Sequence, residues 1–276
     1  MADIQSYEDL RVERQGYVVV LEMNRPPHNF FTPESVSHLV ETLEKLDDDP
    51  SCRVTVLAAS GKSFCAGEEF GGKPLPPAEF IAGGRRMYEL AARMFEIRKP
   101  MIAAVHGAAV GGGVGPTLAC DFRITCESAT FSTNFTRLGL HSGFGISAIL
   151  PRVVGEQNAA TMLLFGRRLK GPEAFKIGLA DQLVKTPEEV RPAAVAMATE
   201  LATWSAPLAV LDTRTTLRRG LGDVVRASAD RELLCQAALM ATADATEGIR
   251  AYAGKTRVGG DGLVIGLGCA GVESQR

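Results

Sequence analysis

The chain of 276 residues has almost no net charge and few aromatic residues. It carries 30 Lys and Arg against 32 Asp and Glu, for a formal net charge of -2 at pH 7, and aromatic side chains make up 6% of it. Such a surface has no field to hold a polyanion and little area for stacking bases, so we exclude nucleic acid as the main partner. A hydrophobic content of 46% is typical of a globular protein of one or two domains.

The six cysteines lack the spacing of a disulfide framework or a zinc site. No two form a C-x-x-C pair, and no histidine lies at zinc-ligand spacing from any of them, so we predict no metal site. Residues 1–16 are polar and charged, unlike a secretory leader, and no apolar run approaches the ~20 residues that span a bilayer. We therefore expect a cytoplasmic protein with reduced thiols and no membrane partner.

Buried strands alternate with amphipathic helices along the first half of the chain. Continuous apolar runs predict the strands, and apolar stripes at helical spacing predict the helices. This alternation predicts an α/β fold, and the pattern from about residue 144 onward is mainly helical, with a weak strand signal at 180–184. The expected strands are 17–23, 53–59, 100–105 and 122–126, and the expected helices are 32–45 and 78–97.

Three familiar catalytic or nucleotide-binding motifs are missing or stand in the wrong context. Residues 61–63 look like the end of a P-loop, but the position that requires glycine is Val56. Residues 143–148 fit G-x-G-x-x-A, yet no clear strand precedes them, which argues against a dinucleotide site. A serine hydrolase is not supported either, because the chain has no G-x-S-x-G elbow.

Two glycine-rich turns, at 64–68 and 111–113, each follow an expected strand. Three consecutive glycines let the backbone approach a ligand closely, although close helix–strand packing alone explains one or two of them. The first N–H groups of the helix that follows have no acceptor within it. One N–H from each turn, aimed at one carbonyl oxygen, would form an oxyanion hole. The pair of turns therefore indicates a catalytic site.

These turns belong to a series of short motifs in which the chain resembles the crotonase family, also called the enoyl-CoA hydratase/isomerase family. The series extends from about residue 10 to residue 253, and its order is more specific than any single motif. Its members are Arg25-Pro26 with Asn29, residues 63–67, residues 106–113 running on to Cys120-Asp121, Gly139-Leu140, residues 164–166, residues 174–180 and residues 247–249.

The resemblance implies an α/β fold built as a spiral of ββα units with a helical C-terminal region. Residues 1–204 would form the spiral core that binds acyl-CoA, and residues 205–276 would form a helical assembly region with a Gly-rich tail. Family members are usually trimers or dimers of trimers, so a homotrimer or hexamer is expected. Coenzyme A would enter as part of the acyl-CoA substrate, without a separately bound cofactor. Residues 258–276 depart from the basic ending that is common in the family.

Carried over residue by residue, the family's two oxyanion-hole donors fall on the backbone N–H groups of Glu68 and Gly112. These groups would stabilise an enolate-like charge on the thioester carbonyl. Coenzyme A would lie along the segment that contains Arg25 and His28 and along the backbone of Phe64 to Ala66. The direction of the Glu68 side chain is a separate question that the sequence leaves open.

The chain departs from the family where hydration of an enoyl-CoA needs its two glutamates. The first of these positions is Gly115 and the second is Phe135, and neither residue can titrate. General acid–base help is worth ~10²–10⁴-fold, so hydration should be severely reduced while thioester binding remains. The alternatives are isomerisation, thioester hydrolysis, decarboxylation, C–C bond cleavage, or binding of a CoA thioester without turnover.

Other side chains near these motifs have weaker claims to the chemistry. His141 lies close to Gly143, where some relatives place a catalytic Asp, and an imidazole there could serve as an acid or a base, although a hydrogen-bonded loop histidine is the more common reason for such a residue. Glu69 fills an acidic position that is commonly structural in the family. Cys65 has no base near it in the sequence, so we interpret it as structural.

Overall fold

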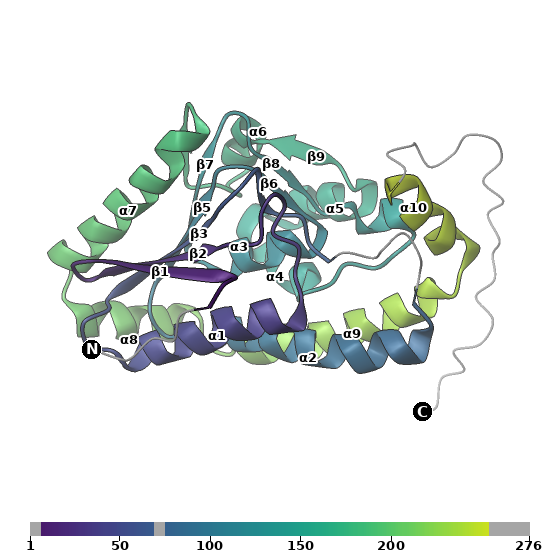
Figure 1. Cartoon of the computed structure of the whole chain (residues 1–276), viewed down its shortest axis with the longest axis horizontal. Helices are drawn as coiled ribbons and strands as arrows, with labels where there is room; N and C mark the ends of the chain where they lie inside the picture. Colours follow the sequence, from purple (N-terminus) through teal and green to yellow (C-terminus); the bar gives the residue numbers. More distant parts are fainter. Residues whose placement is uncertain (1–6, 69–74, 254–276) are drawn as a thin grey trace.

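A six-stranded sheet lies at the centre of the protein, whose computed structural model describes residues 7–68 and 75–253 (Figure 1). Its strands are parallel except for β1, which pairs antiparallel with β2. The order across the sheet is β1 (Leu10–Gln15), β2 (Val18–Met23), β3 (Val54–Ala59), β5 (Met101–Val105), β7 (Phe122–Cys126) and β10 (Gln182–Val184).

A second, smaller sheet holds the strands that follow the central ones in the chain. It consists, in order, of β4 (Ser63–Cys65), β6 (Ala108–Val110), β8 (Thr130–Ser132) and β9 (Arg168–Lys170). The pairs β3–β4, β5–β6 and β7–β8 each give one strand to each sheet, and a helix follows each pair. The expected spiral of ββα units is therefore confirmed.

Helices cover both faces of the central sheet, which explains why its strands are apolar on both sides. Helix α7 packs on one face with small residues, among them Val190, Ala194 and Ala198, against Val20 and Val56. On the other face α1, α2 and α9 lie side by side (Figure 1). The helices are α1 (Pro33–Asp48), α2 (Pro77–Glu96), α3 (Gly115–Ala119), α4 (Ile146–Val154), α5 (Glu156–Phe165), α6 (Gly171–Lys176), α7 (Pro187–Trp204), α8 (Pro207–Leu217), α9 (Leu221–Met240) and α10 (Ala243–Ala253), with 3₁₀ turns η1 (Gly111–Val114) and η2 (Asn134–Leu138).

The expected elements agree with the structure to within a few residues. Helix α1 begins as predicted, because the Thr32 hydroxyl accepts from the Ser35 N–H and Pro33 occupies the first turn. The sequence did not predict β1 or the second sheet. Strand β1 alternates between buried and exposed residues, and β4, β6 and β8 have three residues each, which is too short to show a period.

The C-terminal helices pack back onto the core. Helix α9 runs along α2, and α10 contacts η2 and α9. The predicted Gly-rich tail, residues 258–276, lies outside the described residues. In the part of the chain that the structure describes, none of the helices by itself has the length and hydropathy to cross a bilayer, while the bent pair α7 and α8 meets that test by length and composition alone.

Candidate active site

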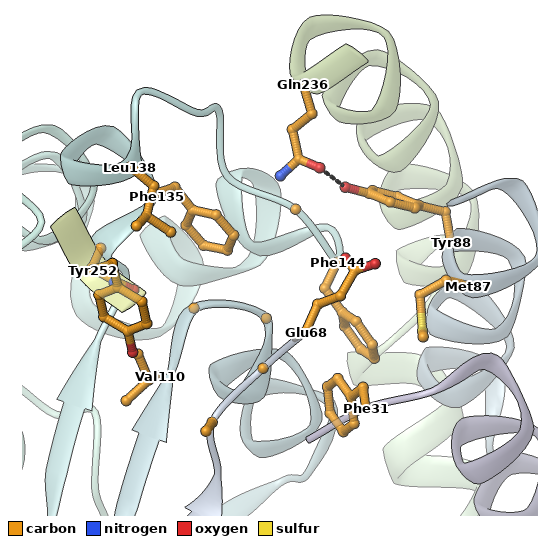
Figure 2. Close-up of a pocket in the computed structure, with 16 residues that line it drawn as sticks. Phe31, Glu68, Met87, Tyr88, Val110, Phe135, Leu138, Phe144, Gln236 and Tyr252 are labelled. Atoms are coloured by element: carbon orange, nitrogen blue, oxygen red, sulfur yellow. Dashed lines mark hydrogen bonds between the residues drawn. The ribbon is translucent and has the colours of Figure 1, made fainter. Parts of the chain in front are cut away.

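A cavity of about 60 Å³ lies between the two glycine-rich turns and the α2–α9 helix pair (Figure 2). It brings together residues from segments that are far apart in the sequence. The lining residues are Phe31, Ala66, Gly67, Glu68, Met87, Tyr88, Val110, Gly111, Gly112, Asn134, Phe135, Leu138, Gly143, Phe144, Gln236 and Tyr252.

Parallel pairing of β4 with β6 places the two glycine-rich turns side by side. Ser63 pairs with Ala108, so both strands end at the same edge of the second sheet and the chain turns there twice. A Cβ atom built on Gly67, whose φ is +81°, would lie 2.8 Å from the Val110 carbonyl oxygen and 3.3 Å from the Gly112 nitrogen. The turns therefore touch through backbone atoms, which requires glycine at 67.

The three glycines of the second turn differ in the local constraint that each position imposes. A Cβ on Gly113 would lie 2.2 Å from the Cys65 carbonyl oxygen, so this position serves close packing. Gly111 has a φ of +55°. Gly112 has no atom within 4 Å of its missing Cβ, and it faces the cavity. Because it stands in the first turn of η1, its N–H has no acceptor within that 3₁₀ turn.

Glu68 continues the first turn and places a carboxyl group in the cavity. The N–H of Phe31 donates to the Gly67 carbonyl at 2.8 Å, which fixes the backbone just before Glu68. Figure 2 shows the Glu68 side chain extending toward Tyr88. Although the residue as a whole is exposed at the cavity mouth, desolvation raises the pKa of its carboxyl group.

Tyr88 and Gln236 form the polar wall opposite Glu68, where α2 meets α9. The Tyr88 hydroxyl donates to Gln236 Oε1 at 2.7 Å, and Gln236 Nε2 donates to the His141 carbonyl at 2.6 Å (Figure 2). Desolvation, followed by the charges of Glu232 and Glu68, raises the pKa of Tyr88 well above its usual value. The phenol is therefore neutral at physiological pH and acts as a fixed hydrogen-bonding group.

Phenylalanine rings occupy the space around Gly115 and Phe135, the two positions where the sequence resemblance places the glutamates of the family. The Phe144 ring fills the space over Gly115 and stacks on Phe31, with ring centroids 5.8 Å apart. Phe135 is buried and lines the cavity near Leu138. Neither position offers a titratable group, as the sequence predicted.

The structure brings only some of the predicted site residues to the cavity. Glu68, Gly112 and Ala66 line it, whereas Arg25, His28 and Phe64 do not. Arg25 instead lines a separate small cavity with Asn29 and Phe30. His28 Nδ1 is 3.0 Å from the Ser63 hydroxyl, the Arg25 guanidinium donates to the Phe30 carbonyl, and the Phe64 side chain is fully buried.

His141 is not among the residues that line the cavity. Its Nδ1 lies 2.9 Å from the Ser142 carbonyl, and its own carbonyl holds Gln236. This arrangement favours the hydrogen-bonded loop histidine over a catalytic one. The fully buried Cys65 has a thiol pKa raised to about 12 by desolvation, which fits the structural interpretation. Glu69 lies outside the described residues.

Sequence reasoning missed Tyr88, Gln236 and Asn134. Tyr88 and Gln236 stand on helical stripes that predict only core packing. Asn134 is 7% exposed, and within the described residues its Oδ1 has no hydrogen-bond partner, so it offers the cavity an acceptor. Residues 7–68 and 75–253 contain no group of three or more His, Cys, Asp or Glu that is placed to hold a metal ion.

The chain matches known proteins over most of its length. Residues 13–259 match the family model described as "Enoyl-CoA hydratase/isomerase". A protein of Syntrophomonas wolfei named crotonyl-CoA hydratase is 32% identical over 91% of this chain and 97% of its own. A peroxisomal Delta(3,5)-Delta(2,4)-dienoyl-CoA isomerase of Arabidopsis thaliana is 29% identical over 90% and 95%. The crystal structure of an enoyl-CoA hydratase/isomerase from Pseudoalteromonas atlantica aligns with a TM-score of 0.79 and 27% identity, over 91% and 99%.

Proposed function

The chain belongs to the enoyl-CoA hydratase/isomerase family, and from this premise we propose that it is an enzyme that binds an acyl-CoA thioester and stabilises an enolate on its carbonyl oxygen. The donors are the backbone N–H groups of Glu68 and Gly112. Coenzyme A enters only as part of the substrate, along the segment containing Arg25 and His28 and the backbone from Phe64 to Ala66.

The observation that carries the proposal is the contact between the two turns. A Cβ atom on Gly67 would lie 3.3 Å from the Gly112 nitrogen, so the two turns are in contact at this point. Glu68, which follows Gly67, and Gly112 both line the same wall of the cavity. A carbonyl oxygen placed there receives two backbone donors in a pocket lined mainly by apolar residues. Donors held in such a place stabilise developing negative charge strongly because they need no reorganisation.

Hydration is the less favoured reaction for this site. Gly115 and Phe135 cannot activate a water molecule or deliver a proton, and the Phe144 ring fills the space over Gly115. Among the relatives, one is named a crotonyl-CoA hydratase and another a dienoyl-CoA isomerase. We favour isomerisation, with hydrolysis, decarboxylation or CoA-thioester binding without turnover as alternatives from the same site.

Large apolar side chains exposed on the described part of the chain support a homotrimer or hexamer. Trp204, Leu208 and Leu217 are 88%, 74% and 81% exposed, and Leu164 and Phe165 are exposed as well. Burying such side chains against a second copy removes apolar area from water. A cytoplasmic location stays a prediction from the sequence.

Exchange of the α-protons of butyryl-CoA in D₂O, followed by mass spectrometry, tests the proposal without presupposing the reaction. Wild-type protein should catalyse exchange, because an enolate that is quenched by D₂O, or by an acid that has exchanged its proton with D₂O, takes up deuterium. Gly112→Pro removes the N–H and should slow exchange by about 10²–10³-fold. Gly112→Ala keeps the N–H, and its methyl group meets no atom within 4 Å, so its loss should be smaller.

Two outcomes count against an enolate-forming enzyme. The first is wild-type protein that binds butyryl-CoA but neither exchanges its α-protons nor converts any member of a panel of acyl-CoAs, which would indicate a binding protein. The second is unchanged exchange in a folded Gly112→Pro variant. Rapid hydration of crotonyl-CoA would instead contradict the conclusion drawn from Gly115 and Phe135.

A further inference from the structure

We propose that the side chain of Glu68 is the acid–base group of this site and moves a proton at the carbon next to the thioester carbonyl. The inference rests on the proposed function, because the backbone N–H of the same residue is one of the two donors to the carbonyl oxygen. Glu68 would thus act twice, through its amide on the oxygen and through its carboxyl group on the adjacent carbon.

The direction of the side chain is the first support. Glu68 lines the cavity, and Figure 2 shows its carboxyl group pointing toward Tyr88 rather than away from the site. Among the described residues that line the cavity it is the only Asp or Glu. A carboxyl group that is alone in the site has no second carboxylate there to compete for a substrate proton.

The surroundings of the carboxyl group are the second support. Met87 and Phe144 provide apolar contacts in this part of the cavity, and Tyr88 provides a neutral polar one. The Glu68 charge helps to raise the pKa of Tyr88, so the two groups are close enough to interact electrostatically. A partly desolvated carboxyl group binds a proton more readily than one in water, which suits a general base that must also return the proton.

Covalent geometry is the third support. The α-carbon is bonded directly to the carbonyl carbon, so it lies within the reach of a glutamate side chain on the residue whose amide holds the oxygen, and the Glu68 side chain is directed into the cavity. The Glu68 carboxylate takes the α-proton, and the C–H electron pair becomes the C=C bond of the enolate. The charge moves onto the oxygen held by the two N–H groups. The protonated Glu68 then returns its proton to carbon, and the carbonyl re-forms.

The arrangement also selects a substrate class. When the acyl chain has a double bond between its β- and γ-carbons, the proton can return to the γ-carbon, which moves the double bond into conjugation with the carbonyl. This isomerisation needs one carboxyl group and no water. The apolar part of the cavity, formed by Phe135, Leu138 and Tyr252, is placed to receive the acyl chain (Figure 2).

The test is Glu68→Gln, which keeps the backbone N–H and the side-chain shape but removes the base. With butyryl-CoA in D₂O, we expect α-proton exchange to fall by about 10²–10⁴-fold while the dissociation constant for butyryl-CoA, measured calorimetrically, changes little. Conversion of 3-hexenoyl-CoA to 2-hexenoyl-CoA should fall in parallel. Glu68→Asp restores a carboxylate and should recover part of the activity. Glu127→Gln removes an exposed carboxylate in a loop and is the matched control.

The pH profile gives a readout that a structural role would not produce. Exchange by wild-type protein should rise with pH, with a midpoint above the ordinary glutamate pKa of 4.5, because the carboxylate is the active form. The other titratable side chains that line the described cavity are Tyr88 on α2 and Tyr252 on α10, and the charge of Glu232 on α9 reaches Tyr88. In Glu68→Gln this rise should disappear.

Each remaining outcome overturns one of the two proposals or both. If Glu68→Gln exchanges α-protons at the wild-type rate while Gly112→Pro does not, the oxyanion hole stands and the role of the Glu68 side chain is wrong. If wild-type protein shows no exchange and no isomerisation, both proposals fail together. If Glu68→Gln loses binding of butyryl-CoA in proportion to exchange, the carboxyl group only contributes to binding and the acid–base role is refuted.

Discussion

The ring of Phe144 occupies the space that a side chain at Gly115 would need. A Cβ atom built on Gly115 would lie 2.2 Å from Phe144 Cδ1. Phe144 is itself held in the left-handed region, with a φ of +63°, and its ring is buried against Phe31. The packing of the site therefore requires a residue without a side chain at 115, where the sequence resemblance places the first glutamate of the family. A single substitution at 115 cannot restore that glutamate without displacing the ring.

Gly115→Ala should therefore destabilise the protein by about 1–3 kcal/mol, the usual cost of forcing extra atoms into a packed core. Phe144→Ala removes the ring, so adding it to Gly115→Ala should give a double variant more stable than the sum of the two single effects predicts. The measurement is urea unfolding followed by circular dichroism, because the only tryptophan, Trp204, is 88% exposed and reports poorly on the core.

Gly83→Ala is the control for that series. Gly83 is helical and has no atom within 4 Å of a Cβ, so alanine there should be neutral or stabilise α2 by up to about 1 kcal/mol. If the changes in the free energy of unfolding caused by Gly115→Ala and Phe144→Ala simply add in the double variant, the Phe144 ring and a side chain at 115 do not compete for the same space.

Gly67→Ala should remove activity by a different route. A φ of +81° destabilises alanine at this position by about 1–2 kcal/mol relative to glycine, and the alanine Cβ would lie 2.8 Å from the Val110 carbonyl oxygen. The turn must then move away from Gly112, which separates the two proposed donors. We expect loss of α-proton exchange by about 10²-fold or more, together with a lower unfolding midpoint.

Gly16→Ala isolates the backbone contribution to that result. Gly16 has a φ of +61° but no atom within 4 Å of a Cβ, so its alanine variant carries similar strain without a clash. Its stability should fall by the strain alone, about 1–2 kcal/mol, while exchange continues at the wild-type rate. A Gly67→Ala variant as active as Gly16→Ala would mean that the spacing of the two turns does not matter for catalysis.

The parts of the fold that follow from periodicity were predictable, whereas much of the site was not. Strands β3 and β5 were predictable because both of their faces are buried, which gives continuous apolar runs. The start of α1 was predictable from Thr32 and Pro33. The Tyr88–Gln236 hydrogen bond joins residues 148 positions apart, each on a stripe that predicts only core packing. Such a contact depends on how α2 and α9 are placed, which local sequence does not encode.

The glycine-rich turns were recognisable because their constraint, unlike the placement of α2 and α9, is local and shows in the residue type. Gly67 and Gly113 are required by backbone atoms that lie within 3 Å of their missing Cβ atoms, so the constraint is visible as residue identity. The direction of the Glu68 side chain was open in the sequence, because a carboxyl group after a glycine fits a solvent-facing and a cavity-facing conformation equally well. In the structure the Glu68 side chain lines the cavity and extends toward Tyr88 of α2 (Figure 2).

Cys65 should be inert toward thiol reagents in the native protein. Its side chain is fully buried and the pKa of its thiol is raised to about 12, so almost no thiolate is present at neutral pH. Cys235, which is partly exposed on α9, is the internal comparison. After brief treatment with iodoacetamide, peptide mass spectrometry should find Cys235 modified, Cys65 unmodified and α-proton exchange retained. Rapid alkylation of Cys65 with loss of exchange would support a role for it in the reaction.

The buried carboxyl group of Glu232 should make stability depend on pH. Glu232 is fully buried and accepts from the N–H groups of Gly145 and Ser147 and from the Ser147 hydroxyl, yet desolvation raises its pKa above 4.5. Because the folded protein holds this proton more tightly than the unfolded chain, the stabilisation is complete below about pH 4.5 and is lost as pH rises through the folded pKa. Stability relative to Glu232→Gln should therefore fall with rising pH.

Urea unfolding of both proteins at intervals between about pH 5 and about pH 8 measures this difference, with a slope of at most about 1.4 kcal/mol per pH unit for one group. Glutamine at 232 also disturbs the hydrogen bonds to Gly145 and Ser147, but that change adds an offset that does not titrate. Titratable groups that do not interact with Glu232 cancel in the difference, whereas His141, whose charge acts on Glu232, stays coupled to it. Parallel stability curves across this range would show that Glu232 has the same proton affinity in the folded and unfolded chain, so that its three hydrogen bonds fully offset its burial.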